Sequence, residues 1–282
     1  MKYKMVCIDM DGTLLNSKKK ITQNTKDILK KVYDEKGVHV VITTGRIYNN
    51  AIYYSNLLGI KSAVISGNGA YIKEEYCEKE IYKETLSSKQ CKEILEVCSE
   101  FGVMPQIYTI NHIYIYSKVY WMLSYILMGI NVPDNYKVIL KNVRKKEQWY
   151  KVIEDLSGDI IKVLIINLDE NKLNKIQKVI KEKLNLEVHK SSKYSLEING
   201  EGVDKGNGVR VLGEYYGVKR EEIICIGDNN NDISMIKYAG LGVAMKNGSD
   251  QAKEVADYVT DSNDEDGVAK VIEKFILETK ES

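Results

Sequence analysis

Two aspartates near the N-terminus, Asp9 and Asp11, have the type and spacing of a reactive pair. They directly follow the apolar run 4–8, and the turn-forming Gly12 comes next. A short apolar run rich in β-branched residues that ends at a glycine predicts a buried strand. Side chains two residues apart in an extended segment point the same way, about 6–7 Å apart, so both carboxylates could flank one small group. An Asp-x-Asp-Gly sequence is also a common plain turn, and this alternative stays open for the motif alone.

Small polar or acidic residues also follow the predicted strands 38–42, 62–65 and 223–227. These residues are Thr44, Gly45, Arg46, Asn68, Asp228, Asn231 and Asp232. If the sheet is parallel, the carboxyl ends of its strands meet at one edge, where open α/β sheets bind their ligands. Unrelated surface loops would have no reason to repeat this pattern, so we expect these residues to form one site.

The acidic members of this set predict a metal ion. Asp9, Asp11 and Asp228 would be three crowded carboxylates, and unpaired like charges are costly, so a positive charge must lie among them. A hard divalent cation with oxygen ligands meets this need, and Mg²⁺ suits one or two carboxylates together with phosphate oxygens and water.

Other residues of the chain have groups that suit a phosphate. Thr44 offers a hydroxyl, the turns at Gly12 and Gly45 offer backbone N–H groups, and Lys205 offers an ammonium. Together with the predicted metal ion, these groups indicate phosphoryl transfer.

The first and last parts of the chain alternate strands and helices. Thr22 can cap a helix over 22–36 that ends at Gly37, and a second helix is expected over 48–58. In the last part we expect helices over 206–216, 233–238 and 268–277 and strands over 223–227, 241–244 and 256–260. This rhythm predicts an α/β fold, a Rossmann-like core with a parallel sheet and helices on both of its faces.

The middle of the chain breaks this rhythm. Helices are expected over 87–101, 119–129, 146–156 and 170–184, and strands over 103–108, 112–116, 138–140, 160–168, 186–190 and 194–198. Consecutive strands such as 103–108 and 112–116 indicate an antiparallel hairpin. We therefore expect an inserted α+β domain at 84–198 between two parts of the core, 1–83 and 199–282.

Composition excludes several classes of protein. The 282 residues carry a formal net charge of +1, which gives no global reason to expect a nucleic-acid or membrane partner. The longest uncharged stretch, 119–133, is shorter than the roughly 20 residues of a membrane span. The five cysteines are odd in number and form no Cys-x-x-Cys pair, which favours a reduced, cytoplasmic setting over a disulfide framework or a zinc site.

The order of the motifs resembles one family. The chain is similar to phosphatases of the haloacid dehalogenase superfamily, in particular the Cof-like subfamily with a large α/β cap between its second and third motifs. The four motifs that carry the resemblance are Asp9-Met10-Asp11-Gly12-Thr13-Leu14, Ile42-Thr43-Thr44-Gly45-Arg46, Gly202-Val203-Asp204-Lys205-Gly206 and Gly227-Asp228-Asn229-Asn230-Asn231-Asp232. The insert 84–198 has the expected size and place, and Gly248 is a departure because such proteins often carry Ala there.

The resemblance implies catalytic and metal-binding roles. Asp9 would attack phosphorus and form an aspartyl-phosphate. Asp11 would protonate the leaving alcohol and then activate water. Mg²⁺ would be held by Asp9, the backbone carbonyl of Asp11 and Asp228.

The resemblance also implies how the phosphate is held, because phosphoryl transfer depends mainly on positioning and charge neutralisation. The phosphate-binding residues would be Gly12, Thr44, Gly45, Lys205 and Asn231. The supporting residues would be Arg46, Asn68 and Asp232, with Asp232 orienting Lys205 or a metal-bound water.

Small phosphorylated metabolites, such as sugar phosphates or phosphorylated cofactors, are the substrates that the resemblance implies. The insert would act as a cap that selects the leaving group, in a monomer or homodimer. Two alternatives remain: a phosphosugar mutase on the same core, and a non-enzymatic phosphate-binding or signalling protein. Analysis of the products, free phosphate or an isomerised sugar phosphate, separates the hydrolase from the mutase.

Overall fold

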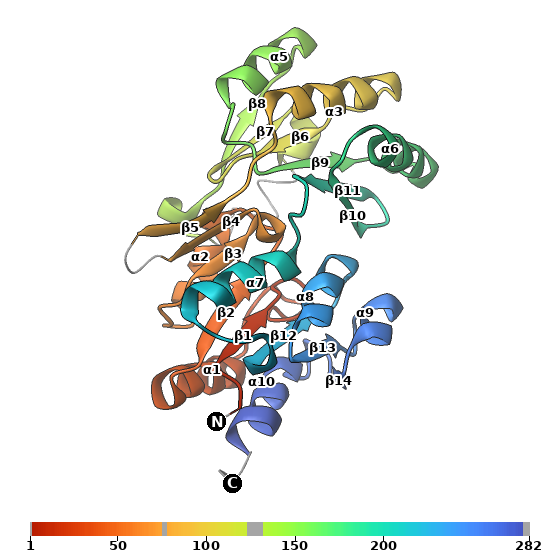
Figure 1. Ribbon diagram of the computed structural model, residues 1–282. Helices are drawn as coiled ribbons and strands as arrows, with labels where there is room; N and C mark the ends of the chain where they lie inside the picture. The colour runs from red at the N-terminus through yellow and green to blue at the C-terminus, as the bar shows by residue number, and fades with distance from the viewer. Residues whose placement is uncertain (1, 75–77, 123–131, 279–282) are drawn as a thin grey trace. The chain divides into compact units, whose positions relative to one another are not determined.

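The computed structural model describes residues 2–74, 78–122 and 132–278, and the chain divides into two compact units (Figure 1). The first unit comprises the chain up to Gly45, Tyr54–Tyr82 and the chain from Asp204 onward. The second comprises Arg46–Tyr53 and Lys83–Val203, a slightly wider range than the insert 84–198 expected from the sequence. No helix in the described part of the chain is long and apolar enough to cross a membrane.

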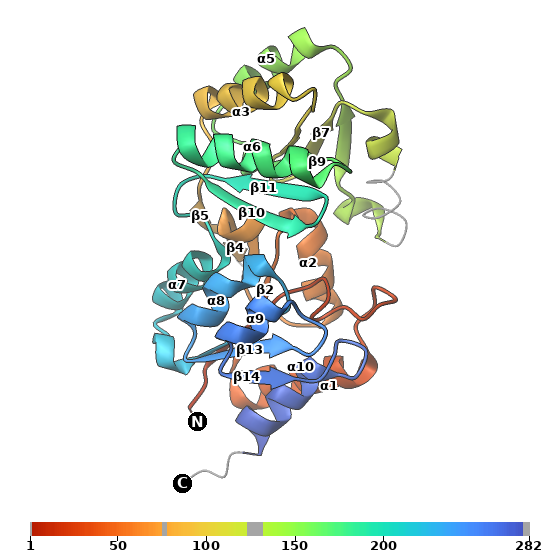
Figure 2. The same ribbon diagram turned by 90° about the vertical axis from the view of Figure 1, so that its right-hand side faces the viewer.

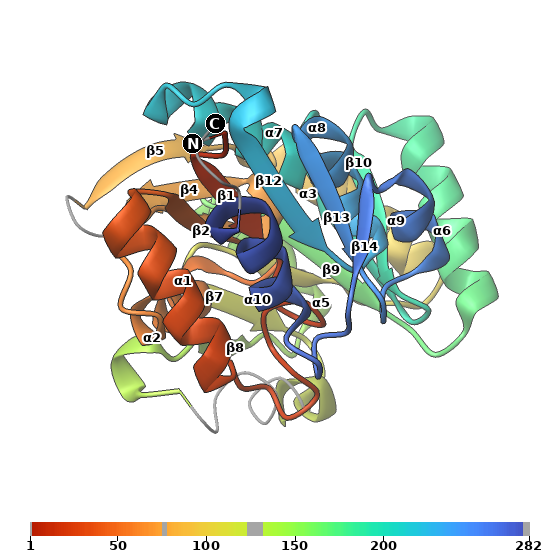
Figure 3. The ribbon, with the colours of Figure 1, turned by 90° about the horizontal axis from the view of Figure 1, so that it is seen from below.

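The first unit contains an eight-stranded sheet in the order β14-β13-β12-β1-β2-β3-β4-β5. Its strands are β1 (Met5–Ile8), β2 (His39–Thr43), β3 (Val64–Ser66), β4 (Tyr71–Glu74), β5 (Lys79–Lys83), β12 (Ile223–Gly227), β13 (Leu241–Met245) and β14 (Tyr258–Thr260). The pairings from β14 to β3 are all parallel, and β14, β13, β12, β1 and β2 lie side by side in Figure 3. The predicted α/β class and parallel core are confirmed.

The centre of this sheet aligns the strand ends that carry the site. Every residue of β1 and β12 is buried, as expected for strands that are covered on both faces and therefore read as unbroken apolar runs. Ile8 is in register with Ile226 on one side and with Ile42 on the other. The chain therefore leaves β1, β2 and β12 at the same edge, where the predicted site residues follow.

Helices cover both faces of the first sheet, with α7 and α8 on one face and α1 and α10 on the other (Figure 2). The helices of this unit are α1 (Gln23–Lys36), α7 (Lys205–Tyr216), α8 (Ile233–Tyr238), α9 (Asp250–Val255) and α10 (Gly267–Ile272), which continues into a π-helical turn (Glu273–Leu277). The expected ends of α1 are confirmed, because Thr22 accepts a hydrogen bond from Thr25 N–H and Gly37 ends the helix at φ 65°.

The second unit is a six-stranded sheet with helices on one face, in the strand order β10-β11-β9-β6-β7-β8 (Figure 1). Its strands are β6 (Gln106–Tyr108), β7 (His112–Ile115), β8 (Ile139–Asn142), β9 (Lys162–Ile166), β10 (Glu187–Ser192) and β11 (Ser195–Asn199). Its helices are α3 (Ser88–Glu100), α5 (Lys146–Asp155) and α6 (Glu170–Lys183), while α2 (Tyr48–Leu57) contributes to both units. The antiparallel hairpin β6–β7 is confirmed, and this unit has the expected α+β pattern.

Among the strands and α-helices of the described residues, β4, β5 and α9 were absent from the sequence-based prediction. β4 and β5 lie at the edge of the sheet and are interrupted by charged residues, so they lack the apolar signature of the central strands. α9 has only six residues, too few for a helical period to stand out. The predicted strand 103–108 is shortened to β6, since Pro105 has no N–H to donate to a ladder. The predicted helix 119–129 lies outside the described residues beyond Met122.

Candidate active site

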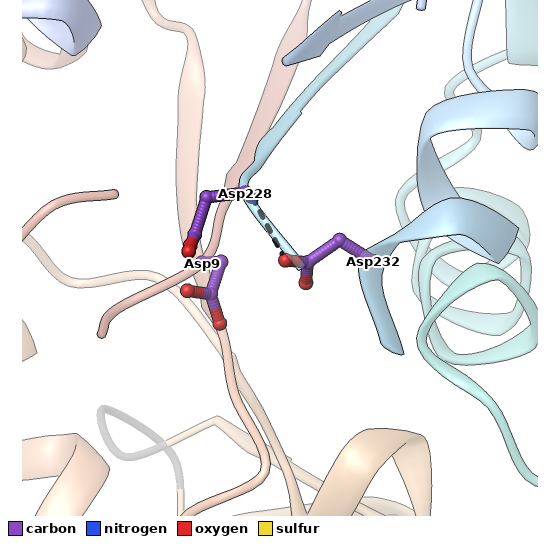
Figure 4. A group of neighbouring side chains, drawn as sticks. All are labelled: Asp9, Asp228 and Asp232. Atoms are coloured by element: carbon purple, nitrogen blue, oxygen red, sulfur yellow. Dashed lines mark hydrogen bonds between the residues drawn. The ribbon is translucent and has the colours of Figure 1, made fainter. Parts of the chain in front are cut away.

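Three carboxylates meet at the carboxyl edge of the first sheet. Asp9 follows β1, Asp228 follows β12, and Asp232 ends the 3-10 turn Asn230–Asp232. One oxygen from each lies within 4.8 Å of the others, and Figure 4 shows the three side chains turned toward a common point. The parallel register brings Asp9 and Asp228 together because Asp9 N–H still donates to Ile226 O at 2.9 Å.

A buried lysine neutralises part of this cluster. Lys205, which begins α7, is fully buried, and its Nζ lies 2.6 Å from Asp9 Oδ1 and 2.5 Å from Asp232 Oδ1. The preceding Asp204 caps the helix by accepting from Asn207 N–H at 2.8 Å, so the lysine leaves a firmly anchored helix start. The two carboxylates hold the Lys205 ammonium in place, where it can donate a hydrogen bond to an anionic group.

The carboxylate of Asp232 is fully engaged by the protein. Its Oδ1 accepts from Lys205, and its Oδ2 accepts from the N–H groups of Asp228 at 2.9 Å and Asn229 at 2.8 Å. Asp232 therefore orients Lys205 and shapes the loop that carries Asp228. This leaves Asp9 and Asp228 as the two carboxylates suited to hold a cation.

The charge balance of the cluster fits a cation. Burial, followed by repulsion from Asp232, raises the pKa of Asp9 well above its usual value. Burial and the same neighbour raise the pKa of Asp228 to about 6. Burial alone would lower the pKa of Lys205, but Asp232 and Asp9 together raise it, so the lysine stays charged. One ammonium does not neutralise three carboxylates, and the all-oxygen donor set matches a hard divalent ion.

Asp11 is not a member of this cluster of three carboxylates. β1 ends at Ile8, and the chain turns at once, with Leu15 N–H donating to Met10 O at 2.8 Å. The two-residue period of a strand therefore does not extend to Asp11, whose Oδ1 instead accepts from Lys19 Nζ at 2.9 Å. The structure thus groups Asp232, in place of Asp11, with Asp9 and Asp228.

The turn after Asp11 contacts Asp228 directly. Gly12 has φ +92°, and a Cβ at this position would lie 2.5 Å from Asp228 Oδ2, so only glycine fits. Thr13 Oγ1 donates to Asp228 Oδ1 at 2.8 Å. Thr13 was not among the predicted site residues, although it belongs to the first motif.

Thr44, Asn68 and Asn231 are linked by hydrogen bonds. Asn68 N–H donates to Thr44 O at 3.0 Å, and Asn231 Nδ2 donates to Asn68 Oδ1 at 3.2 Å. Asn68 itself is left-handed, with φ 61° and ψ 31°, which points to a conformation held by its surroundings. These three predicted residues belong to one unit.

The two remaining predicted residues, Gly45 and Arg46, belong to different units. Gly45 follows Thr44 in the first unit, whereas Arg46 belongs to the second unit. There, Arg46 Nη1 donates to Asn50 Oδ1 at 2.6 Å.

A parallel α/β core with clustered aspartates and a buried lysine at its carboxyl edge defines a phosphoryl-transfer class of enzyme. Residues 6–272 match the haloacid dehalogenase-like hydrolase family, and the chain belongs to it. It is a phosphatase that acts on phosphorylated substrates.

The named relatives agree along nearly the whole chain. The 5-amino-6-(5-phospho-D-ribitylamino)uracil phosphatase YcsE of Bacillus subtilis is 30% identical over 274 residues, covering 97% of this chain and 96% of its own. Phosphatase YwpJ of the same organism is 29% identical, covering 97% and 100%. Among solved structures, a haloacid dehalogenase-like hydrolase from B. subtilis has a TM-score of 0.85 at 27% identity, covering 97% of this chain and 100% of that one. The subclass IIB sugar phosphatase BT4131 has a TM-score of 0.78 at 26% identity, with 96% and 98% coverage.

Proposed function

We propose that this protein is a Mg²⁺-dependent phosphatase of small phosphorylated metabolites that works through an aspartyl-phosphate on Asp9. The observation that carries the proposal is the buried Lys205 between Asp9 and Asp232, 2.6 and 2.5 Å from their oxygens. Lys205 holds the Asp9 carboxylate in a fixed orientation and offers its positive charge to an incoming phosphate. Positioning and charge neutralisation supply most of the catalysis in phosphoryl transfer.

In the first step, an Asp9 oxygen forms a bond to phosphorus while the bond from phosphorus to the alcohol oxygen breaks. The carboxyl group of Asp11 gives its proton to the departing oxygen. Thr44, Lys205 and Asn231 hold the oxygens of the transferring group.

In the second step, water attacks the phosphorus of the aspartyl-phosphate, and the bond from phosphorus to Asp9 breaks. Asp11 takes the proton from that water, so inorganic phosphate leaves and both aspartates return to their starting states. The sum of the two steps is hydrolysis of a phosphate monoester.

Asp9, Asp228 and the backbone carbonyl of Asp11 would hold Mg²⁺. When bound, it reduces the repulsion between an anionic nucleophile and an anionic phosphate. Burial is the largest cause of the raised pKa values of Asp9 and Asp228, and repulsion from Asp232 adds to it; a bound cation would offset that repulsion.

We propose that the insert 84–198 acts as the cap and selects the leaving group. Relatives named as 5-amino-6-(5-phospho-D-ribitylamino)uracil phosphatases and as a sugar phosphatase support leaving groups that contain a sugar or sugar-alcohol chain.

A phosphate-release screen tests the proposal. The purified protein is offered sugar phosphates, phosphorylated sugar alcohols, phosphorylated cofactors and an aryl phosphate, each with Mg²⁺ and with EDTA. We expect release from several substrates with Mg²⁺, suppression by EDTA and recovery when Mg²⁺ is restored. Absence of release from every substrate, the aryl phosphate included, would refute the proposed function, and an isomerised sugar phosphate in place of free phosphate would identify a mutase.

A further inference from the structure

Two asparagines outside the four motifs hold the turn that carries Asp11. Asn247 lies in the loop between β13 and α9, and Asn263 lies in the loop between β14 and α10. The residues belong to neighbouring strand ends, since β13 pairs with β14. Both asparagines bond to the backbone that follows Asp11, although they are more than 230 positions away in the sequence.

Asn247 bridges two loops with the two ends of its amide. Its Nδ2 donates to Gly12 O at 2.8 Å, and its Oδ1 accepts from Asn263 N–H at 3.0 Å. A carbonyl can only accept and a backbone N–H can only donate, so this arrangement determines which end of the amide faces each partner. The peptide that joins Gly12 to Thr13 is thereby tied to the loop after β14.

Asn263 ties the far end of the same turn. Its Nδ2 donates to Leu15 O at 2.8 Å, and the neighbouring Asp264 accepts from Ser17 N–H at 2.9 Å. The turn from Gly12 to Leu15 therefore has a side-chain donor at each end. Both donors come from one connected pair of asparagines.

The loop that carries Asn247 also contacts Asp228. Ser249 N–H donates to Asp228 O at 2.8 Å. A Cβ at Gly248 would lie 2.8 Å from that same carbonyl, so the glycine permits a close approach of the two backbones. Residues 247–249 therefore connect the backbone beside Asp11 to the backbone of Asp228.

We propose that Asn247 and Asn263 are positioning residues for phosphate-ester cleavage, which act by fixing the backbone of the Asp11–Leu15 turn. The inference rests on the proposed function, because it assigns to the two amides the placement of the acid Asp11. Neither asparagine touches a reacting atom in this scheme. Loss of either donor lets the turn shift, and small displacements in an active site lower rates by about 10- to 100-fold.

The test compares Asn247→Ala, Asn263→Ala and Asn247→Asp with the wild type on two substrates, an alkyl phosphate and an aryl phosphate. Asn247→Asp keeps the acceptor for Asn263 but loses the donor for Gly12. A poor leaving group depends on Asp11 as an acid and a good one does not. We expect kcat for the alkyl phosphate to fall by about 10- to 100-fold in all three variants, and kcat for the aryl phosphate to fall much less.

Two comparisons separate positioning from general loss of folding. Ser262→Ala is the matched control, because Ser262 lies in the same loop and its hydroxyl donates to Glu265 Oε2 at 2.7 Å, away from the Asp11–Leu15 turn. The kcat of this variant should equal that of the wild type. In an Asp11→Asn background, Asn247→Ala should cost much less than in the wild type, because the group it positions is already gone.

Equal losses on both substrates, no loss at all, or full additivity with Asp11→Asn would each overturn the inference. A wild-type protein that releases phosphate from neither substrate would instead contradict the proposed function. The two failures are therefore distinguishable in one set of assays.

Discussion

Lys205 and Asp9 form a 2.6 Å ion pair across 196 positions of the sequence, inside the first unit, with Lys205 fully buried and Asp9 largely buried. The same ammonium contacts Asp232, so one lysine links the loop after β1 to the loop after β12. Removing one partner of a buried ion pair leaves an uncompensated charge. The pair is therefore expected to matter for stability as well as for activity.

Lys205→Met should lower the free energy of unfolding by about 3–5 kcal/mol, because Asp9 and Asp232 would remain buried without their cation. The measurement is urea unfolding at pH 7.5 with EDTA. Lys31→Met is the control, since Lys31 is exposed on α1 and its replacement should change stability by less than about 0.5 kcal/mol. A stability equal to that of the wild type would show that the ion pair contributes nothing.

Asp9→Asn should remove turnover almost completely, by about 10⁴-fold or more in kcat, as expected when a covalent nucleophile is lost. The fold should persist, because the amide fills the same space as the carboxylate. Phosphate release and circular dichroism check both points. Asp27→Asn, at an exposed position of α1, serves as control and should keep full activity. Substantial activity in Asp9→Asn would remove Asp9 as the nucleophile.

Asp11→Asn should lower kcat far more for an alkyl phosphate than for an aryl phosphate. The amide cannot donate the proton that a poor leaving group requires, whereas general acid catalysis typically contributes about 10²–10⁴-fold. Steady-state rates on a series of phosphate esters with graded leaving-group pKa values provide the measurement. A uniform loss along the series would count against Asp11 as the acid.

Gly12→Ala should weaken cation binding and lower kcat, in addition to straining the backbone. Its Cβ would lie 2.5 Å from Asp228 Oδ2, so the carboxylate must move and cation binding should weaken along with kcat. Gly37→Ala is a matched control, because Gly37 is also left-handed, at φ +65°, but has no neighbouring atom within 4 Å of the added Cβ. We expect Gly37→Ala to lose about 1–2 kcal/mol of stability with unchanged Mg²⁺ affinity. Equal Mg²⁺ affinity in the two variants would contradict the role given to Gly12.

Magnesium affinity should fall at acid pH. A carboxylate binds a cation only when it is ionised, and the pKa of Asp228 is raised to about 6 by burial and by Asp232. Protons therefore compete with Mg²⁺ for Asp228 at pH values above those at which an ordinary aspartate titrates. The affinity for Mg²⁺ should drop about tenfold for each pH unit below 6 per proton displaced. Calorimetric titration with Mg²⁺ at pH 5, 6 and 7.5 measures this. An affinity that is flat across this range would argue against Asp228 as a ligand, and Asp228→Asn should bind weakly at every pH.

Much of the fold could be predicted because apolar runs and helix ends are local features. The run 4–8 and the cap at Thr22 led directly to β1 and α1, since burial on both faces and satisfaction of helix N–H groups act within a few residues. β4, β5 and α9 were missed because their stability comes from the neighbouring sheet and helices, which no local pattern records.

Part of the candidate site could likewise be predicted from the sequence, and part could not. Residue types at the strand ends were enough to predict phosphoryl transfer and to select Asp9 and Asp228, and Lys205 was added for its ammonium, because carboxylates, hydroxyls and ammonium groups have few chemical uses when they gather at one sheet edge. The pairing of Asp9 and Asp11 stays a prediction, because β1 stops at Ile8 and Asp11, in the turn beyond it, forms an ion pair with Lys19.

The sequence by itself determined the order of most strands and helices, the chemical groups at the strand ends and the family. The resemblance left open whether Asp232 orients Lys205 or a metal-bound water. Only the tertiary structure decided that Lys205 lies between Asp9 and Asp232, and that Asn247 and Asn263 bond to the turn beside Asp11. The physical reason is that hydrogen bonds between distant positions depend on where the folded chain places each amide and carbonyl. That placement is set by the packing of the whole unit and not by the type of any one residue.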